Sequence, residues 1–238
     1  MAREEKILEV QHLFVTLDGK QILSDISFSL SKGEALAIVG PNGAGKTVLF
    51  RALLGSVPYT GDIRWQDGVG IGYVPQRFAV DKDIPLTVRE FFFLKAPRFW
   101  FPSRGFMRHV SHELSAGGLT RTILGQQLSQ LSGGELQRVL VSWAMVGHPS
   151  VLLFDEPTIG IDVGAEETIY DLVRDLRRER HTACILISHD LHIVSAHADR
   201  VLSINKEMIA YGSPDEVLSR KGLTKLYGTR GVLRRLER

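Results

Sequence analysis

A glycine-rich segment with one lysine and one threonine occupies positions 40–47, after a short apolar run. It fits the pattern G-x-x-x-x-G-K-[ST]. Glycines let successive backbone N–H groups point at one anion, and a helix that begins near Gly45 adds its positive dipole end. The ammonium of Lys46 can reach the outer phosphates, and the hydroxyl of Thr47 can coordinate Mg²⁺. The pattern therefore predicts a nucleotide phosphate site. Its residues are Gly40, Pro41, Asn42, Gly43, Ala44, Gly45, Lys46 and Thr47.

Two adjacent carboxylates, Asp155 and Glu156, follow the apolar run 151–154. A carboxylate at the end of a strand suits the coordination shell of Mg²⁺, which we assign to Asp155. Glu156 can accept a proton from an attacking water or polarise it. Adjacent acids are common in turns, so this reading depends on the phosphate segment earlier in the chain.

Two further polar residues end apolar segments. Gln76 follows residues 73–75 and could contact both the metal and the attacking water. His189 follows the apolar run 183–187 and one serine, and a histidine there could reach the terminal phosphate. A histidine at the end of a strand is by itself more often structural, so this role also depends on the phosphate segment.

Ser132, Gly133 and Gly134 precede a second pattern, in which apolar residues recur at the spacing of one helix face. A serine hydroxyl and exposed N–H groups at a helix start again form an anion site. One phosphate segment with two such helix starts indicates a nucleotide shared between two copies of the chain, and a twofold dimer provides this arrangement twice.

These residues need strands and helices that hold them together. Residues 7–17 and 22–30 alternate as half-buried strands, with a turn at Asp18 and Gly19. The apolar runs 34–39, 151–154 and 183–187 predict strands buried on both faces, and a helix is expected from Lys46 to about Gly55. Apolar residues from Ile169 to Leu176 mark another helix. This alternation predicts a parallel sheet with helices on both faces, into which a helical section, about 86–147, is inserted.

Length and composition agree with one domain, or with one core that carries an inserted subdomain. The chain has 238 residues, of which 44% are hydrophobic, enough for a sizeable core. A net charge of +2 gives no reason to expect nucleic acid as a partner. A single cysteine, Cys184, cannot form an internal disulfide, which fits a reducing compartment. We expect no signal peptide and no membrane span, although such a chain can dock on a membrane protein.

In this order, the segments resemble those of ABC transporter ATPases. Residues 40–47, Gln76, 131–137, Asp155-Glu156 and His189 look like the Walker A, Q-loop, signature, Walker B and switch histidine, and Asp162 matches the D-loop aspartate. The resemblance implies an α/β fold with a P-loop NTPase (RecA-like) core, about 1–85 and 148–238. It also implies an N-terminal antiparallel β subdomain and an inserted α-helical subdomain, about 86–147.

The resemblance further implies how such a chain works. Two cassettes close head to tail around two molecules of ATP with Mg²⁺, so that Lys46 and Thr47 of one face Ser132 and Gly134 of the other. Closure moves integral membrane permease subunits and hydrolysis resets them, with Glu156 as general base and His189 as the γ-phosphate contact. The chain is then peripheral, on the cytoplasmic face of the inner membrane.

One position departs from the family pattern. An aromatic residue usually lies near the end of the first strand and stacks on adenine, and here that position is Leu17. Phe14 lies three residues earlier, which is the opposite face of a strand. Apolar contact by Leu17 therefore has to replace adenine stacking.

Shorter segments, at 72–77, 84–88, 137–140, 188–192 and 227–231, resemble the ATPases of bacterial zinc importers. That resemblance implies import of a divalent metal ion, zinc first, delivered by a periplasmic or surface metal-binding protein. ATPases of manganese importers are an alternative, as are those of siderophore or haem importers. A soluble ABC ATPase of repair or translation is a further alternative, but such chains commonly carry two cassettes or long coiled-coil insertions.

Two groups of histidines lie close together in the sequence: His189, His192 and His197, and the pair His109 and His112. We expect neither group to form a zinc site, because neither has helical i, i+4 spacing backed by a carboxylate. Aromatic residues also gather at 91–93 and 99–101. They either pack the core of the helical subdomain or, together with Arg98, line a groove for a helix of the membrane partner.

Overall fold

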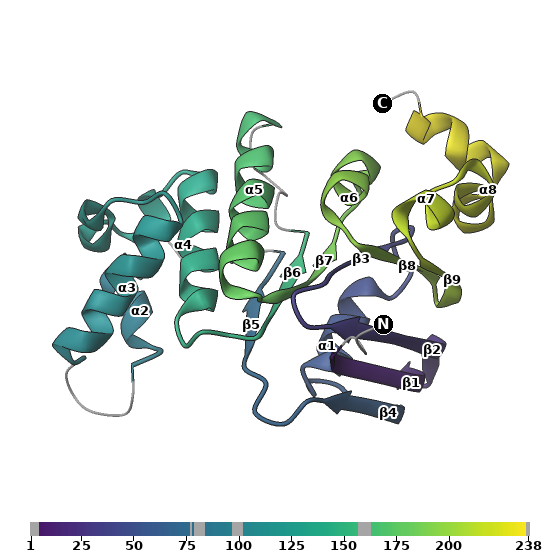
Figure 1. Cartoon of the computed structure of the whole chain (residues 1–238), viewed down its shortest axis with the longest axis horizontal. Helices are drawn as coiled ribbons and strands as arrows, with labels where there is room; N and C mark the ends of the chain where they lie inside the picture. The colour runs from purple at the N-terminus through teal and green to yellow at the C-terminus, as the bar shows by residue number, and fades with distance from the viewer. Residues whose placement is uncertain (1–4, 77, 79–83, 97–101, 157–162, 237–238) are drawn as a thin grey trace.

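The computed structural model describes residues 5–76, 78, 84–96, 102–156 and 163–236. Within these residues the strands form one nine-stranded sheet in the order β4-β1-β2-β9-β8-β3-β7-β6-β5 (Figure 1). The strands are β1 (Lys6–Leu17), β2 (Lys20–Ser31), β3 (Ala35–Val39), β4 (Thr60–Trp65), β5 (Ile71–Val74), β6 (Val151–Asp155), β7 (Ala183–Ile187), β8 (Arg200–Asn205) and β9 (Glu207–Gly212).

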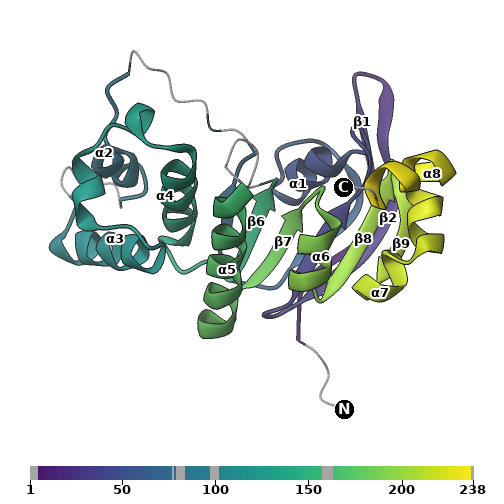
Figure 2. The same ribbon diagram turned by 90° about the horizontal axis from the view of Figure 1, so that it is seen from above.

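The centre of the sheet is parallel and buried on both faces. β3 pairs with β7 and β8, and β6 pairs with β5 and β7, all in parallel. Every residue of β3, β6 and β7 is buried, because alternate side chains point into two separate hydrophobic cores. One core is shared with α1 (Lys46–Leu53), and the other with α5 (Val163–Arg180) and α6 (Leu191–His197). Figures 1 and 2 show α1 on one face and α5 and α6 on the other.

One antiparallel part consists of β1, β2 and β4, and β9 also pairs antiparallel with β8. The predicted turn at Asp18 and Gly19 is confirmed, and both residues have positive φ, 49° and 72°, as the tightest hairpins require. β1 also has a register shift near His12, whose φ is 48°. At this point Gly61 of β4 lies so close to β1 that a Cβ on Gly61 would be 2.1 Å from the carbonyl oxygen of His12. This bulge explains why apolar and polar residues alternate only partly along β1.

A helical section lies between β5 and β6 and extends to one side of the sheet (Figure 2). It contains α2 (Val88–Phe93), α3 (Arg104–Ala116), the 3₁₀ turns η1 (Arg121–Gly125) and η2 (Leu128–Gln130), and α4 (Gly133–Met145). The predicted fold class is thereby confirmed, while the boundaries near 86 and 147 stay predictions. After β9 come α7 (Pro214–Val217) and α8 (Arg220–Leu236), which is kinked at Gly228. Among the helices in the described part of the chain, none has the length and apolarity to cross a membrane.

Candidate functional site

The glycine-rich segment connects β3 to α1, as its sequence predicts. Gly43 and Gly45 have φ of 79° and 96°, in the left-handed region that favours glycine, and Gly45 is the residue before the first turn of α1. Gly40 is needed for a different reason: a Cβ there would lie 2.2 Å from the carbonyl oxygen of Ile204 in β8. The loop is also anchored by the backbone N–H of Lys206, which donates to the Ala44 carbonyl at 3.0 Å. Close backbone contacts with β8 and Lys206 therefore help to fix the shape of the loop.

Lys46 lies against this loop, although its side chain is charged. Only 6% of the side chain is exposed, and Nζ donates to the carbonyl oxygens of Gly40 at 3.0 Å and Pro41 at 3.2 Å. The same ammonium lies 3.9 Å from Oε1 of Glu156. A buried ammonium between loop carbonyls and a carboxylate is placed to meet an anion that enters the loop.

Asp155 ends β6 and is almost fully buried. The hydroxyl of Thr47 donates to Oδ1 of Asp155 at 3.4 Å. Burial raises the pKa of Asp155 to about 6, and the neighbouring charge of Glu156 adds to the rise, while Thr47, Lys46 and Tyr73 oppose it. The pKa of Tyr73 is in turn raised to about 12, by burial and by the charge of Asp155. Burial therefore disfavours the charged form of Asp155, and the nearby carboxylate of Glu156 disfavours it further.

The side chains of Gln76, His189 and Lys46 all lie close to the carboxylate of Glu156. Nε2 of Gln76 donates to Oε2 of Glu156 at 2.5 Å, and Nε2 of His189 lies 2.5 Å from Oε1. The carboxylate is 10% exposed. Glu156 has a φ of 48°, a conformation that a non-glycine residue keeps only where its surroundings impose it. Its N–H donates to the carbonyl of Ile187 at 3.2 Å, so β7 holds the backbone in this conformation.

Four adjacent parallel strands position this cluster. Gln76, Glu156 and His189 follow the ends of β5, β6 and β7, and the glycine-rich loop follows β3. Because the carboxyl ends of parallel strands meet at one edge of a sheet, the four segments meet there too. The structure thus brings together Lys46, Thr47, Gln76, Asp155 and His189 around Glu156, as the sequence predicts. Their catalytic roles remain predictions.

The second predicted anion site lies elsewhere in the chain. Ser132 is the N-cap of α4 and is exposed, and it shares a capping box with Glu135. Its hydroxyl donates to Oε2 of Glu135 at 2.7 Å, and the N–H of Glu135 donates back to that hydroxyl at 3.3 Å. In both views α5 and β6 lie between α4 and α1 (Figures 1 and 2). Within one chain, therefore, the helix start at Ser132, Gly133 and Gly134 belongs to a different part of the fold from the phosphate loop.

Of the two remaining predicted residues, Leu17 and Asp162, the structure describes only Leu17. Leu17 ends β1 and is half-buried, packed against the core that α1 shares. Phe14 is also half-buried, but three positions away on the strand. The predicted replacement of adenine stacking by apolar contact stays a prediction. Asp162 lies outside the described residues.

The aromatic cluster is in part a packing feature. Phe91 and Phe92 are buried, and Phe91 stacks on Trp143 of α4 with ring centroids 5.1 Å apart. The indole N–H of Trp143 donates to the Phe91 carbonyl at 3.2 Å. These contacts support the core-packing reading for Phe91 and Phe92. Arg98 and residues 99–101 lie outside the described part, so the groove reading stays open for them.

A further group of three side chains does not follow from the elements that the sequence predicts. His109 does have a carboxylate at i+4, because Glu113 lies four residues later on α3, and Nδ1 of His109 is 3.7 Å from Oε1 of Glu113. His148, from the loop after α4, completes a group of three potential metal ligands. The spacing of His109 and Glu113 was visible in the sequence. The approach of His148 was not, because it depends on how α4 packs.

Comparisons with known proteins agree with this geometry. A family model described as ABC transporter matches residues 23–159. The zinc import ATP-binding protein ZnuC 1 of Hahella chejuensis is 38% identical over 230 residues, which cover 95% of this chain and 85% of that protein. ZnuC of Yersinia enterocolitica is 38% identical over 229 residues, covering 95% and 87% of the two chains.

Solved structures of ABC transporter proteins are also similar to this chain. An inward-facing ABC transporter of the metal-chelate type superposes with a TM-score of 0.85 at 26% identity, covering 94% of this chain and 89% of that one. The protein cbiO1 from Clostridium perfringens, part of the ABC transporter complex cbiONQ, superposes with a TM-score of 0.78 at 27% identity, covering 98% and 97%. With a phosphate loop and its partner residues at one sheet edge, and with these matches over most of its length, the chain belongs to the ABC transporter family.

Proposed function

We propose that this chain is the ATP-hydrolysing subunit of a bacterial importer for a divalent metal ion, and that the ion is zinc. The observation that carries the enzymatic part is the position of the Glu156 carboxylate, held by Gln76 and His189 beside Lys46. The relatives named for zinc import, at 38% identity over almost the whole chain, support the choice of ion.

In the proposed reaction, the loop N–H groups and the ammonium of Lys46 bind the β- and γ-phosphates of ATP. Glu156 accepts a proton from the water that attacks the γ-phosphorus. Gln76 and His189, which both contact Glu156, orient that water and the terminal phosphate. The bond between the γ-phosphorus and the bridging oxygen breaks, and ADP and phosphate are released.

The residues present fit a magnesium ion. The hydroxyl of Thr47 and the carboxylate of Asp155 are hard oxygen donors that already lie 3.4 Å apart. The neighbouring charge of Glu156 helps to raise the pKa of Asp155, and a dication bound there would offset that repulsion. Thr47 and Asp155 would hold the ion, with Gln76 as a further ligand, and the bound ion would neutralise charge on the phosphates.

The separation of the two anion sites supports a head-to-tail homodimer. In such a dimer Ser132, Gly133 and Gly134 of one chain, with Asp162, complete the site formed by residues 40–47 of the other. Leu17 would contact the adenine. Permease subunits in the membrane would receive the closing motion at the cytoplasmic face of the inner membrane, and a periplasmic or surface metal-binding protein would deliver the ion.

A second candidate is an importer of chelated metal, such as a siderophore or haem. The similarity to the transporter of the metal-chelate type favours it, although its 26% identity is below the 38% of the zinc-named relatives. Manganese import is the closest alternative among free ions. These substrates differ in the permease and the binding protein rather than in the residues around Glu156.

Growth of the native host after deletion of this chain distinguishes the candidates. We expect the deletion to impair growth only when zinc is removed by a chelator, and zinc in the medium to restore growth. The wild-type chain should restore it too, whereas the Glu156→Gln variant should not. A growth defect that only manganese, or only a chelated iron source, relieves would refute the zinc assignment but leave the ATPase assignment intact.

A further inference from the structure

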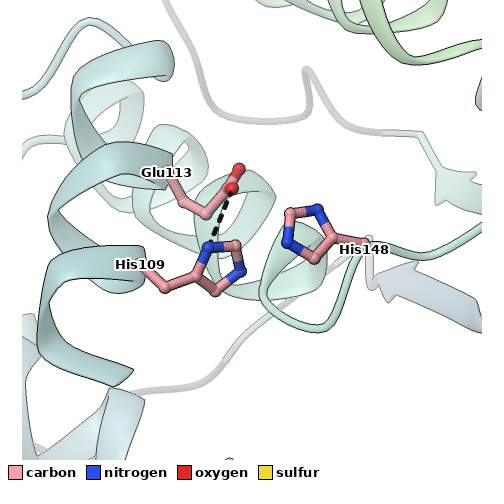
Figure 3. Close-up of side chains that lie close together, drawn as sticks. All are labelled: His109, Glu113 and His148. Carbon is pink, nitrogen blue, oxygen red and sulfur yellow. Dashed lines mark ion pairs between the residues drawn. The ribbon is translucent and has the colours of Figure 1, made fainter. Parts of the chain in front are cut away.

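A second cluster of metal-ligating side chains lies outside the nucleotide site. His109 and Glu113 lie on one face of α3, since residues four apart on a helix are neighbours. His148 comes from the loop between α4 and β6 and points toward them (Figure 3). One ring nitrogen of each histidine and one oxygen of Glu113 all lie within 4.8 Å of one another.

The separations are close to those of a metal site. Nitrogen and oxygen ligands lie about 2.0–2.2 Å from zinc, so ligand atoms of a tetrahedral site are roughly 3.3 Å apart. Nδ1 of His109 is already 3.7 Å from Oε1 of Glu113, and the two imidazole rings have centroids 4.4 Å apart. His148 is exposed and lies in a loop, so rotation of its side chain can close the remaining gap.

The surroundings of Glu113 hold its carboxylate in an orientation that suits metal binding. Only 1% of its side chain is exposed, and Nη1 of Arg180 donates to Oε2 at 2.8 Å. Oε1 therefore faces the imidazoles of His109 and, at 3.4 Å, of the exposed His112. The ion pair with Arg180 accounts for the burial of Glu113, but not for the histidines gathered at its other oxygen. Outer contacts of this kind orient a ligating carboxylate in known metal sites.

The imidazole of His109 has a buried nitrogen, Nε2, that lacks a hydrogen-bond partner among the described residues. A buried polar atom without a partner is rare in folded proteins and calls for an explanation. A metal ion that binds Nε2 would give this atom a partner directly, whereas a metal ion on Nδ1 would leave it without one.

The charges around the cluster narrow the choice of ion. Among the described residues of this cluster, Glu113 supplies the carboxylate, Arg180 is a fixed positive charge, and His109, His112 and His148 supply imidazole nitrogens. A hard cation such as Mg²⁺ prefers several oxygen ligands and would meet only one here, with a guanidinium nearby. Imidazole ligands suit zinc and neighbouring transition metals, which bind nitrogen strongly.

We propose that His109, Glu113 and His148 form a binding site for one divalent transition-metal ion of the zinc class, with an open coordination position. The ion would connect α3 to the loop that leads into β6, the strand that ends at Asp155 and is followed by Glu156. This proposal does not depend on which substrate the importer carries, or on ATP hydrolysis.

Calorimetric titration of the purified full-length chain with Zn²⁺, after chelator treatment and without nucleotide, tests the proposal. The principal variant is His148→Gln, because an exposed loop side chain can be changed without disturbing the core, and the double variant adds His109→Gln. The control is His192→Gln, an exposed histidine of α6. Circular dichroism verifies that each variant is folded.

We expect wild type and His192→Gln to bind one more Zn²⁺ per chain than the double variant, and His148→Gln to lose at least about tenfold in affinity at that site. Mg²⁺ should not displace the ion. Cobalt in place of zinc should give the visible absorption of a four-coordinate ion in wild type but not in the double variant. Equal stoichiometry and affinity for wild type and double variant would refute the site.

Discussion

Nε2 of His189 lies 2.5 Å from Oε1 of Glu156, so a side chain that follows β7 holds the carboxylate that follows β6. The two strands are neighbours in the sheet, and the backbone N–H of Glu156 donates to the carbonyl of Ile187 in β7. β7 and the segment that follows it thus contact both the backbone and the side chain of Glu156. This arrangement gives Glu156 a defined direction before any substrate is bound.

The first prediction concerns this carboxylate. Glu156→Gln keeps the size of the side chain and its contact with Gln76 but removes the group that accepts a proton. We expect the turnover of ATP to fall by roughly 10²–10⁴-fold while ATP still binds, because Lys46 and the loop are unchanged. Steady-state phosphate release and nucleotide titration measure the two effects, with exposed Glu207→Gln as control. Turnover near the wild-type rate would contradict the assignment of the base.

The second prediction uses the distance between the two anion sites within one chain. Lys46→Ala and Ser132→Arg should each inactivate the ATPase alone. In a mixture, a dimer of one chain of each kind has one site with both defects and one intact site. Random pairing then restores up to about a quarter of the wild-type rate. Phosphate release from the mixture measures this, and a rate equal to the sum of the separate variants would argue against a shared site.

The third prediction concerns the adenine end of the site. With Leu17 in place of an aromatic ring, we expect ATP and GTP to bind with similar affinity. Leu17→Tyr should tighten both by about 1–3 kcal/mol, the range of stacking between a base and an aromatic side chain. Phe14→Leu, on the other face of β1, should change neither. Fluorescence titration with both nucleotides tests this, and a strong ATP preference of the wild type would count against it.

The sequence predicted those parts of the fold and site that depend on local patterns. The run that became β3 has apolar residues throughout, and the turn at Asp18 and Gly19 has the residue types that tolerate positive φ. Asp155, Glu156 and His189 were predicted as site residues because they lie within two positions of the end of an apolar run that favours a buried strand, downstream of the phosphate segment. The sheet then brings the ends of such strands together without further information.

What the sequence did not predict depends on long-range packing or weak patterns. No strand was predicted for β4, β5, β8 or β9, and β9 has no buried residue from which a regular pattern could be read. His148 meets His109 only because the end of α4 lies beside α3, and no local spacing indicates this. The contact between Lys95 and Trp143 is of the same kind, as it joins the turn after α2 to α4.

The fourth prediction concerns that contact. Nζ of Lys95 donates to the carbonyl of Trp143 at 2.7 Å and lies 4.1 Å from the centroid of its ring. Lys95 thus caps the carbonyl end of α4 and holds it next to α2. We expect Lys95→Met to reduce the free energy of unfolding by about 1–3 kcal/mol, because buried carbonyls lose a donor. Chemical denaturation at pH 7 measures this, and an unchanged midpoint would contradict it.

The same lysine predicts a dependence on pH. Burial lowers the pKa of Lys95 to about 8 in the folded chain, below the 10.5 of a free lysine. Between these values the unfolded chain binds more protons, so this group makes the folded state more stable as the pH rises. The free energy of unfolding should increase more from pH 7.5 to 9.5 for wild type than for Lys95→Met. Equal changes in the two proteins would show that Lys95 does not titrate in this range.

The last prediction concerns the ion pair between Glu113 of α3 and Arg180 at the end of α5, whose side chains are 1% and 18% exposed. Arg180→Met leaves a buried carboxylate without its cation, so we expect a loss of about 3–5 kcal/mol in the free energy of unfolding. Glu113→Leu together with Arg180→Met removes both charges and should recover most of that loss, because the desolvation penalty disappears with the carboxylate. Denaturation in the presence of a chelator keeps metal binding from contributing. If the double variant is as unstable as Arg180→Met alone, the two side chains contribute through packing rather than through their charges.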